Sequence, residues 1–112
     1  MTQSDITKMF KQLVFVLSIA TPLLPAFAHA EGDITQGSKK ALACQVCHGK
    51  GGHSTDPTYP ILAGQHAPYI VKQLKAFRAG TRKDPIMNGM AAPLSDQDME
   101  DVAAFFHSNG NR

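Results

Sequence analysis

Residues 44–48 read Cys44-Gln45-Val46-Cys47-His48 and place two thiols and one imidazole within little more than one helical turn. On a helix, side chains three or four positions apart lie on the same face. Cys44 and Cys47 therefore lie side by side, and His48 lies one turn beyond Cys44. Thiols so placed can form thioethers to the two vinyl groups of one haem, while the imidazole reaches the iron. The motif is a signature of c-type haem attachment. It predicts Cys44 and Cys47 as covalent sites of haem c and His48 as the proximal iron ligand.

Two other uses of a Cys-x-x-Cys pair are open at this point. A redox dithiol of this kind usually lies in a βαβ unit, and no strand pattern precedes the motif here. A zinc site needs four N or S ligands, which His48, His53 and His66 could complete, although the spacing matches none of the usual zinc patterns. An export signal in front of the motif favours haem, because exported thiols oxidise unless a covalent cofactor consumes them.

The first 30 residues have the features of such a signal. Lys8 and Lys11 give a positive start, an apolar run follows, and Ala28-His29-Ala30 fits the small-x-small cleavage rule. An uncleaved membrane anchor is the alternative. The run has only 16 residues with two prolines, whereas a spanning helix needs ~20 apolar residues. We therefore expect a signal peptide over residues 1–30, a mature chain that begins at Glu31 and has no membrane span, and a periplasmic location.

Residues 31–112 have the size and charge of one small domain. They carry nine Lys or Arg and eight Asp or Glu, a formal charge of +1. Nucleic-acid binding would favour a strongly basic domain. A domain of this size buries only about 60% of its unfolded surface and is marginal unless it is stapled. A haem would supply that staple, because its apolar plane gives short helices a common surface to cover.

Apolar periodicity and capping residues predict an all-α domain with three main helices, over residues 33–47, over residues 66–79, and from Ser95 to a frayed tail at 109–112. Asp33 or Thr35 is the N-cap of the first helix, and Gly80 ends the second. Ser95 and Asp98 form a variant of the capping box. The core-facing stripes are Ile70, Val71, Leu74 and Phe77, then Met99, Val102, Ala103 and Phe106.

Two long loops, residues 49–65 and 81–94, are expected to wrap around the haem. The first holds three apolar residues expected against the ring, Tyr59, Ile61 and Leu62. A basic face lies opposite the apolar stripe of the second helix and comprises Lys72, Lys75, Arg78, Arg82 and Lys83. Such a face is usually only solvated. The alternative is that some of these cations attract an acidic redox partner or screen a haem propionate.

The ligand on the far side of the iron separates electron transfer from ligand binding. The candidates are Met87, Met90, Met99, His53, His66 and His107. Met99 falls on an apolar stripe and is expected to be a packing residue, and His107 lies near the chain end. Met87 and Met90 lie about forty residues beyond the haem motif, where Gly89 and flanking prolines would shape a loop. A thioether favours ferrous iron and raises the potential relative to a second histidine.

Several stretches, taken in order, resemble the short bacterial class I cytochromes c. They are Cys44-Gln45-Val46-Cys47-His48-Gly49, Leu62-Ala63-Gly64-Gln65 with Tyr69, Gln73-Leu74, Phe77-Arg78-Ala79-Gly80, Met90-Ala91-Ala92-Pro93-Leu94-Ser95-Asp96 and Ala103-Ala104-Phe105-Phe106. The resemblance covers nearly all of residues 31–112 and implies a small cytochrome c fold around one haem.

The resemblance also implies residue roles. In that family the methionine shortly before the Leu-Ser-Asp helix start is the distal iron ligand, which implies Met90, with Met87 as runner-up. It further implies that Gly37 packs against Phe105 and Phe106 at a helix crossing. No second Cys-x-x-Cys-His is seen, so the dihaem members of the wider group are not matched over their whole length.

The sequence therefore predicts a periplasmic single-electron carrier and not an enzyme. No nucleophile with its base and no paired acid/base site is visible, and six-coordinate iron would leave no open position for substrate. The expected partners are redox proteins that donate and accept the electron. The alternatives are a haem c subunit of a periplasmic dehydrogenase or oxidoreductase complex, a five-coordinate haem enzyme, and a zinc-stabilised module.

Overall fold

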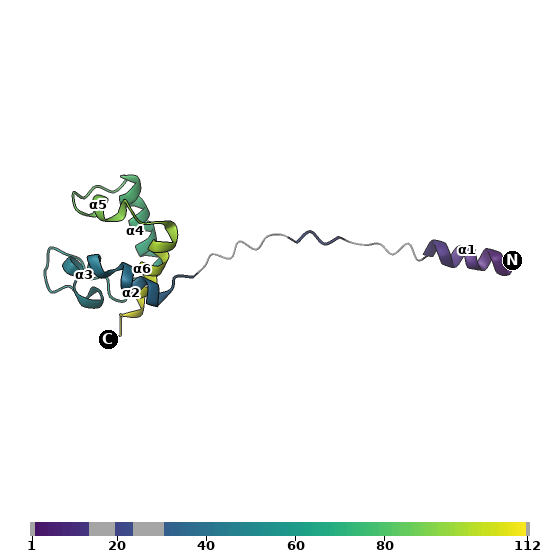
Figure 1. Cartoon of the computed structure of the whole chain (residues 1–112), viewed down its shortest axis with the longest axis horizontal. Helices are drawn as coiled ribbons and strands as arrows, with labels where there is room; N and C mark the ends of the chain where they lie inside the picture. The colour runs from purple at the N-terminus through teal and green to yellow at the C-terminus, as the bar shows by residue number, and fades with distance from the viewer. Residues whose placement is uncertain (1, 14–19, 24–30, 112) are drawn as a thin grey trace.

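The computed structural model describes residues 2–13, 20–23 and 31–111. Its elements are α1 (Gln3–Leu13), α2 (Ile34–Lys40), α3 (Leu42–His48), the 3₁₀ turn η1 (Lys50–Gly52), α4 (Ala67–Ala79), α5 (Met87–Ala91) and α6 (Asp96–Ser108). Within these residues there is no strand, so the predicted all-α class is confirmed. Figure 1 shows α2 to α6 gathered into one body, with α1 apart from it.

The predicted signal peptide falls only partly on described residues. Its positive start lies in α1, which contains Lys8 and Lys11. Most of the apolar run and the whole of Ala28-His29-Ala30 lie outside the described residues, so the signal peptide stays a prediction. Among the helices that the structure describes, none is both long and apolar enough to cross a membrane.

The first predicted helix is in fact two helices that meet at a bend. Ala41 leaves helical geometry, with φ −79° and ψ 1°, and separates α2 from α3. The chain bends at little cost in hydrogen bonds, since the Ala41 N–H still donates to Gly37 at 2.8 Å and its carbonyl accepts from Gln45 at 3.0 Å. Asp33 is the N-cap, because its carboxylate accepts the Gln36 N–H at 2.8 Å. Because of the bend, α2 packs against α6, whereas α3, which carries the haem motif, runs in a different direction.

The crossing of α2 and α6 requires a glycine. A Cβ built on Gly37 would lie 2.0 Å from the carbonyl oxygen of Asp101 and 2.9 Å from the Cβ of Phe105. The backbones are therefore in contact, as the resemblance implied for Gly37 and Phe105. Phe106 is fully buried and contributes to the wall of an internal cavity.

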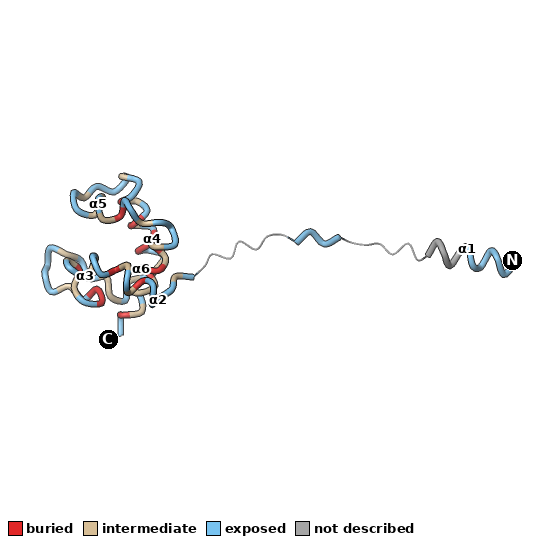
Figure 2. Tube along the Cα trace, in the orientation of Figure 1, coloured by how far each residue is buried: buried red, intermediate tan, exposed pale blue. Residues whose placement is uncertain are grey.

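The core lies between α4 and α6. Figure 2 shows buried residues along these two helices and mostly exposed residues in the loops. Both predicted apolar stripes are confirmed, and the residues that they bury are Ile70, Val71, Leu74, Phe77, Met99, Val102, Ala103 and Phe106. Met99 has no exposed surface, which confirms it as a packing residue. Gly80 ends α4 in the left-handed conformation at φ 75°, and Ser95 and Asp98 form the predicted capping box of α6.

The prediction of a loop over residues 81–94 was wrong in part, because α5 forms within them. The Asp84 carboxylate starts this helix by accepting the N–H groups of Ile86 and Met87 at 2.9 and 2.7 Å. Gly89 lies inside α5, and a Cβ added there would meet open space. It therefore shapes no loop.

The chain end is also more ordered than predicted. Asn109 is buried, and its side-chain amide donates to the Phe105 carbonyl at 2.7 Å. Its own carbonyl accepts from the His53 ring at 3.0 Å. These bonds tie the end of α6 to the loop that follows the haem motif, so Asn109 is not part of a frayed tail.

The 49–65 loop closes on itself at Gly52. The Gly52 carbonyl accepts the N–H groups of Leu62 and Ala63 at 2.9 and 3.1 Å. Gly52 has φ 86°, and a Cβ there would lie 2.8 Å from the ring of Phe106. Only glycine combines this backbone conformation with this close approach. The loop is thereby fixed against the core beside α3.

Candidate haem site

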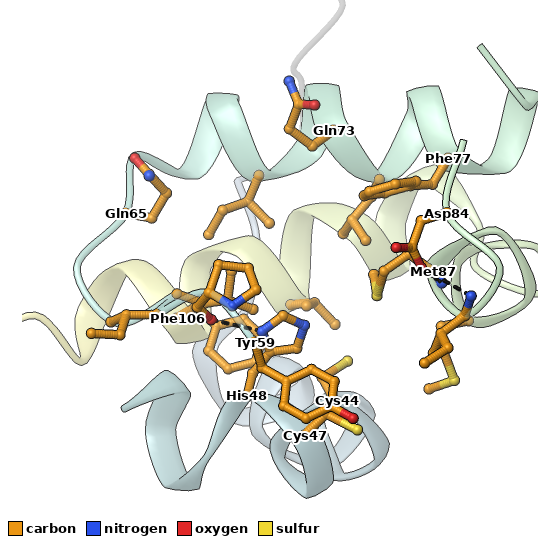
Figure 3. A pocket seen from close by; sticks show the side chains of 18 of the residues that line it. Cys44, Cys47, His48, Tyr59, Gln65, Gln73, Phe77, Asp84, Met87 and Phe106 are labelled. Atoms are coloured by element: carbon orange, nitrogen blue, oxygen red, sulfur yellow. Dashed lines mark hydrogen bonds between the residues drawn. The ribbon is translucent and has the colours of Figure 1, made fainter. Parts of the chain in front are cut away.

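A cavity of about 730 Å³ opens between α3, the 49–65 loop, α4, α5 and α6 (Figure 3). This volume lies within the range of small-molecule and cofactor sites. The helices α4 and α6 supply an apolar wall formed by Ile70, Leu74, Phe77, Val102 and Phe106. A flat apolar macrocycle would be covered by such a wall.

The haem motif forms one side of the cavity. Figure 3 shows Cys44, Cys47 and His48 grouped together on α3, and all three line the cavity. His48 is 7% exposed, and its Nδ1 lies 2.8 Å from the carbonyl oxygen of Pro60. A carbonyl can only accept, so Nδ1 carries the proton and Nε2 keeps its lone pair. Metal-binding imidazoles are oriented by the same kind of bond.

The two thiols fit a covalent cofactor better than a redox dithiol. Cys44 and Cys47 are both free. Burial raises the pKa of the Cys44 thiol, whereas redox-active Cys-x-x-Cys pairs have a lowered pKa. No strand precedes the motif in the described part of the chain, so the βαβ context of a dithiol is missing too.

The loop residues expected against the ring do reach the cavity. Tyr59, Ile61 and Leu62 all line it. The Tyr59 ring meets the His48 ring edge-on, with centroids 6.3 Å apart. Ile61 remains 62% exposed, so it lies at the open rim of the cavity.

Both candidate methionines of α5 line the same cavity. Met87 and Met90 are half-buried, and Met87 also packs against the main hydrophobic core. Figure 3 places Met87 and Asp84 across the cavity from the haem motif. N–H bonds from Met87 and Ile86 hold the pKa of Asp84 below its ordinary value, so its carboxylate stays ionised and keeps the start of α5 in place.

Asn88 fastens α5 to its surroundings. Its side-chain amide donates to the carbonyls of Phe77 and Arg82, both at 2.8 Å. Its side-chain oxygen accepts the Asp84 N–H at 2.8 Å. The methionines are therefore presented to the cavity by a short helix that hydrogen bonds fix at several points.

The histidines considered as alternative ligands lie elsewhere. His53, His66 and His107 do not line the cavity. His53 bonds to Asn109, His107 bonds to the Gln65 carbonyl at 2.9 Å, and the His66 and His107 rings stack 6.5 Å apart. Over residues 2–13, 20–23 and 31–111, no three His, Cys, Asp or Glu side chains are grouped to hold a metal ion. His48, His53 and His66 are thus not brought together as the zinc alternative requires.

The cavity also has a polar wall, and sequence reasoning assigned a role to only one of its residues, Arg82. It consists of Gln65, Tyr69, Gln73, Arg82 and Asp84. The sequence did hold a sign that Tyr69 and Gln73 could reach the cavity. Each precedes a residue of the buried stripe of α4 by one position, so both lie at the edge of that stripe. Arg82 was predicted as one cation of a basic face that is either only solvated or else attracts an acidic redox partner or screens a haem propionate. Its position in the cavity wall depends on the turn after α4, which periodicity does not describe.

Comparison with known proteins gives a consistent result. The family model described as cytochrome c matches residues 34–110. Cytochrome c4 of Stutzerimonas stutzeri is 43% identical over 85% of this chain and 50% of its own length. Cytochrome c-554(548) of Halomonas halodenitrificans is 42% identical over 69% of this chain and 96% of its own length. The crystal structure of reduced recombinant cytochrome c4 from Pseudomonas stutzeri superposes with a TM-score of 0.66, at 45% identity over 70% of this chain and 46% of that one.

The chain spans about half the length of the cytochrome c4 relatives and nearly the whole of the shorter relative. The fold, the Cys-x-x-Cys-His motif on the cavity wall and the apolar lining all fit a covalently bound haem c. The chain belongs to the cytochrome c family, its cofactor is haem c, and its fold is the small cytochrome c fold.

Proposed function

We propose that this chain is a periplasmic carrier of single electrons. The observation that carries the proposal is the arrangement around one cavity, where the haem motif of α3 lies across from Met87 of α5 and Met90 of the same helix also lines the cavity. Haem c supplies an iron that takes up and releases one electron. Cys44 and Cys47 would hold the macrocycle through thioethers, and His48 would bind the iron through Nε2.

The distal ligand would be a methionine sulfur of α5. Met90 is the position that the resemblance implies. Packing favours Met87, which contacts the hydrophobic core and whose N–H is held by Asp84. With either residue, ligation would be His/Met, which favours the ferrous state relative to two histidines.

The role of the protein in electron transfer would be to keep both ligands still. His48 is fixed by Pro60 on one side of the cavity, and α5 is fixed by Asp84 and Asn88 on the other. Little would need to move when the iron changes charge. The apolar wall keeps water away, which favours the less charged ferrous form.

Electrons would enter and leave at the open rim of the cavity. Three apolar side chains and one tyrosine that line the cavity are also strongly exposed, namely Val46 at 84%, Ile61 at 62%, Ile86 at 52% and Tyr69 at 49%. Exposed apolar clusters commonly mark contact surfaces for other proteins. The proposed partners are redox proteins that dock on this rim as donor and acceptor.

Visible spectra of the protein purified from a periplasmic extract test the proposal directly. We expect sharp c-type bands after reduction and a weak methionine-to-iron charge-transfer band at the red end of the oxidised spectrum. Binding of carbon monoxide by the ferrous protein would instead support the alternative, a haem subunit or enzyme with an open position. A colourless protein that contains zinc would refute the proposal.

Exchange of each methionine identifies the distal ligand. Met87→Leu and Met90→Leu keep similar size and apolar character but remove the sulfur. We expect the charge-transfer band to vanish in one variant and to persist in the other. If it persists in both, neither residue binds the iron, and His/Met ligation through α5 is wrong.

A further inference from the structure

Two histidines that the proposed electron transfer does not use lie side by side on the surface, outside the haem cavity. His66 and His107 are both exposed, and neither lines the cavity. Their rings are stacked, with an angle of 29° between the ring planes and centroids 6.5 Å apart. Imidazole is the side chain that most often binds metal ions in proteins. Two imidazoles at this separation are close enough to bind one ion together.

The two histidines belong to backbone segments that touch each other. His66 is the N-cap of α4, and His107 lies in the last turn of α6. The Gly64 N–H donates to the Phe106 carbonyl at 2.9 Å. A Cβ built on Gly64 would lie 2.7 Å from the Cα of Gly110. The chain before α4 therefore contacts the chain at the end of α6, and this contact fixes the two histidines close together.

The hydrogen bonds around the pair orient one ring for a ligand. Nδ1 of His107 lies 2.9 Å from the carbonyl oxygen of Gln65. A carbonyl can only accept, so Nδ1 carries the proton and Nε2 keeps its lone pair. Metal-binding histidines are commonly oriented by such a bond. Gln65 also holds the second histidine, because its Oε1 accepts the His66 N–H at 2.9 Å. The His66 side chain makes no capping bond to α4, so its ring is not used by the helix.

We propose that His66 and His107 form a surface site for one divalent transition-metal ion. Imidazole suits Zn²⁺, Ni²⁺ and Cu²⁺, and Cu²⁺ should bind most tightly of the three. In the described part of the chain, no group of three His, Cys, Asp or Glu side chains is placed to hold a metal ion. Water would therefore supply the remaining ligands. The bound ion would join the start of α4 to the end of α6.

The geometry needs only a small adjustment. An ion 2.0 to 2.1 Å from one nitrogen of each ring would bring the ring centres to roughly 5 Å apart in tetrahedral geometry. The two rings must then approach each other by about 1 Å, which exposed side chains can do by rotation about their χ angles.

Calorimetric titration of the untagged holoprotein with Zn²⁺ tests the site. Zn²⁺ has no redox chemistry and so leaves the oxidation state of the haem iron unchanged. We expect one ion per chain. We also expect the unfolding temperature to rise with Zn²⁺, because only the folded chain brings the two imidazoles together. In His66→Gln and in His107→Gln, the affinity should fall by at least about tenfold, since even the loss of a ligand's supporting partner can cost that much. The double variant should show no rise in unfolding temperature.

His53→Gln is the matched control. It removes another exposed histidine, whose ring bonds to the Asn109 carbonyl at 3.0 Å and which is not part of the stacked pair. We expect it to bind Zn²⁺ like the wild type. The site is refuted if the wild type takes up no Zn²⁺, if the double variant binds as tightly as the wild type, or if His53→Gln weakens binding equally. None of these results would affect the proposed electron transfer, which the visible spectrum tests separately.

Discussion

The two sides of the haem cavity are built in different ways. On the His48 side, one contiguous run of five residues supplies both thiols and the imidazole, and Pro60 fixes the ring. On the opposite side, the methionines lie on a helix of five residues that is too short to be stable by itself. This helix is held by side chains at other positions, chiefly Asp84 and Asn88.

The two sides are also attached to the core by different helices. The haem motif follows directly after α2, whose contact with α6 is close and requires Gly37. The methionine helix α5 contacts α4, and Asn88 bonds it to the Phe77 carbonyl of that helix. The difference teaches that the proposed proximal ligand, His48, is placed by a motif of neighbouring residues, whereas the proposed distal methionine is placed by hydrogen bonds to α5 from other parts of the chain. Damage to either attachment should therefore have its own spectroscopic signature.

The largest effect is expected from the thiols, on which the whole proximal side depends. In the double variant Cys44→Ser and Cys47→Ser, we expect complete loss of covalent haem, because no thioether can form. A haem stain of a denaturing gel measures this directly. Each single variant should retain one thioether and some stain. A stained band in the double variant would show that attachment occurs elsewhere.

A change at Gly37 tests the attachment of the proximal side to α6. In Gly37→Ala the new Cβ would lie 2.0 Å from a backbone oxygen, so α2 and α6 must separate. We expect a loss of about 1 to 3 kcal/mol of unfolding free energy, the usual cost of overpacking. Urea unfolding followed by circular dichroism measures it.

The charge-transfer band serves as the second readout for this variant. It should persist in Gly37→Ala until the whole domain unfolds, because α5 is attached to α4 and not to α2. Gly89→Ala is the control, since its Cβ meets open space, and it should be neutral or stabilising by up to about 1 kcal/mol. Equal destabilisation by the two alanines would contradict the crossing as the cause.

The contrast between the two sides of the cavity also explains which features could be predicted from the sequence. The haem motif, the buried stripes of α4 and α6 and the capping box of Ser95 were all predictable, because each depends on residues close together in sequence. The bend at Ala41 was missed, since nothing in the local pattern interrupts the helix. It follows from tertiary packing, in which α2 lies on α6 while α3 faces the cavity.

The distal side was harder to predict for the same physical reason. α5 forms because the Asp84 side chain accepts two backbone N–H groups and Asn88 bonds to Phe77 and Arg82. These bonds involve a turn and a neighbouring helix, so apolar periodicity carries no sign of them. Sequence therefore indicated a methionine from this segment, while the choice between Met87 and Met90 depends on how the helix is oriented.

A change at Asn88 should weaken the distal side selectively. Asn88→Ala would leave the carbonyls of Phe77 and Arg82 and the Asp84 N–H without their partner. Unsatisfied polar groups in partly buried positions cost about 1 to 3 kcal/mol each, less where water can reach them. We expect the charge-transfer band to disappear at a lower temperature than the helical circular-dichroism signal. If both signals are lost together, as in Gly37→Ala, the two sides of the cavity are not independently attached.

The smallest effect is expected from the ion pairs beside the α2–α6 crossing. Lys40 lies 2.7 Å from Asp98 and 2.6 Å from Asp101, whose side chain is almost fully buried. The hydrogen bond from Lys40, together with those from Ser95, lowers the pKa of Asp98 to about 2. For Asp101, burial raises the pKa, but bonds from Lys40, the Asp33 N–H and Gln97 outweigh burial and lower it.

Because both folded-state pKa values lie below the unfolded value, these carboxylates stabilise the fold above about pH 4, and the contribution is lost as the pH falls. Lys40→Gln should therefore unfold at a higher pH than the wild type during acid titration. The difference between the two proteins in urea midpoint should narrow between about pH 4 and pH 2. Lys39→Gln, at an exposed neighbouring position, is the control and should titrate like the wild type. If the difference in urea midpoint stayed constant across this range, Lys40 would act through packing of its aliphatic chain and not through its charge. The contact of α2 with α6 would then depend on packing alone.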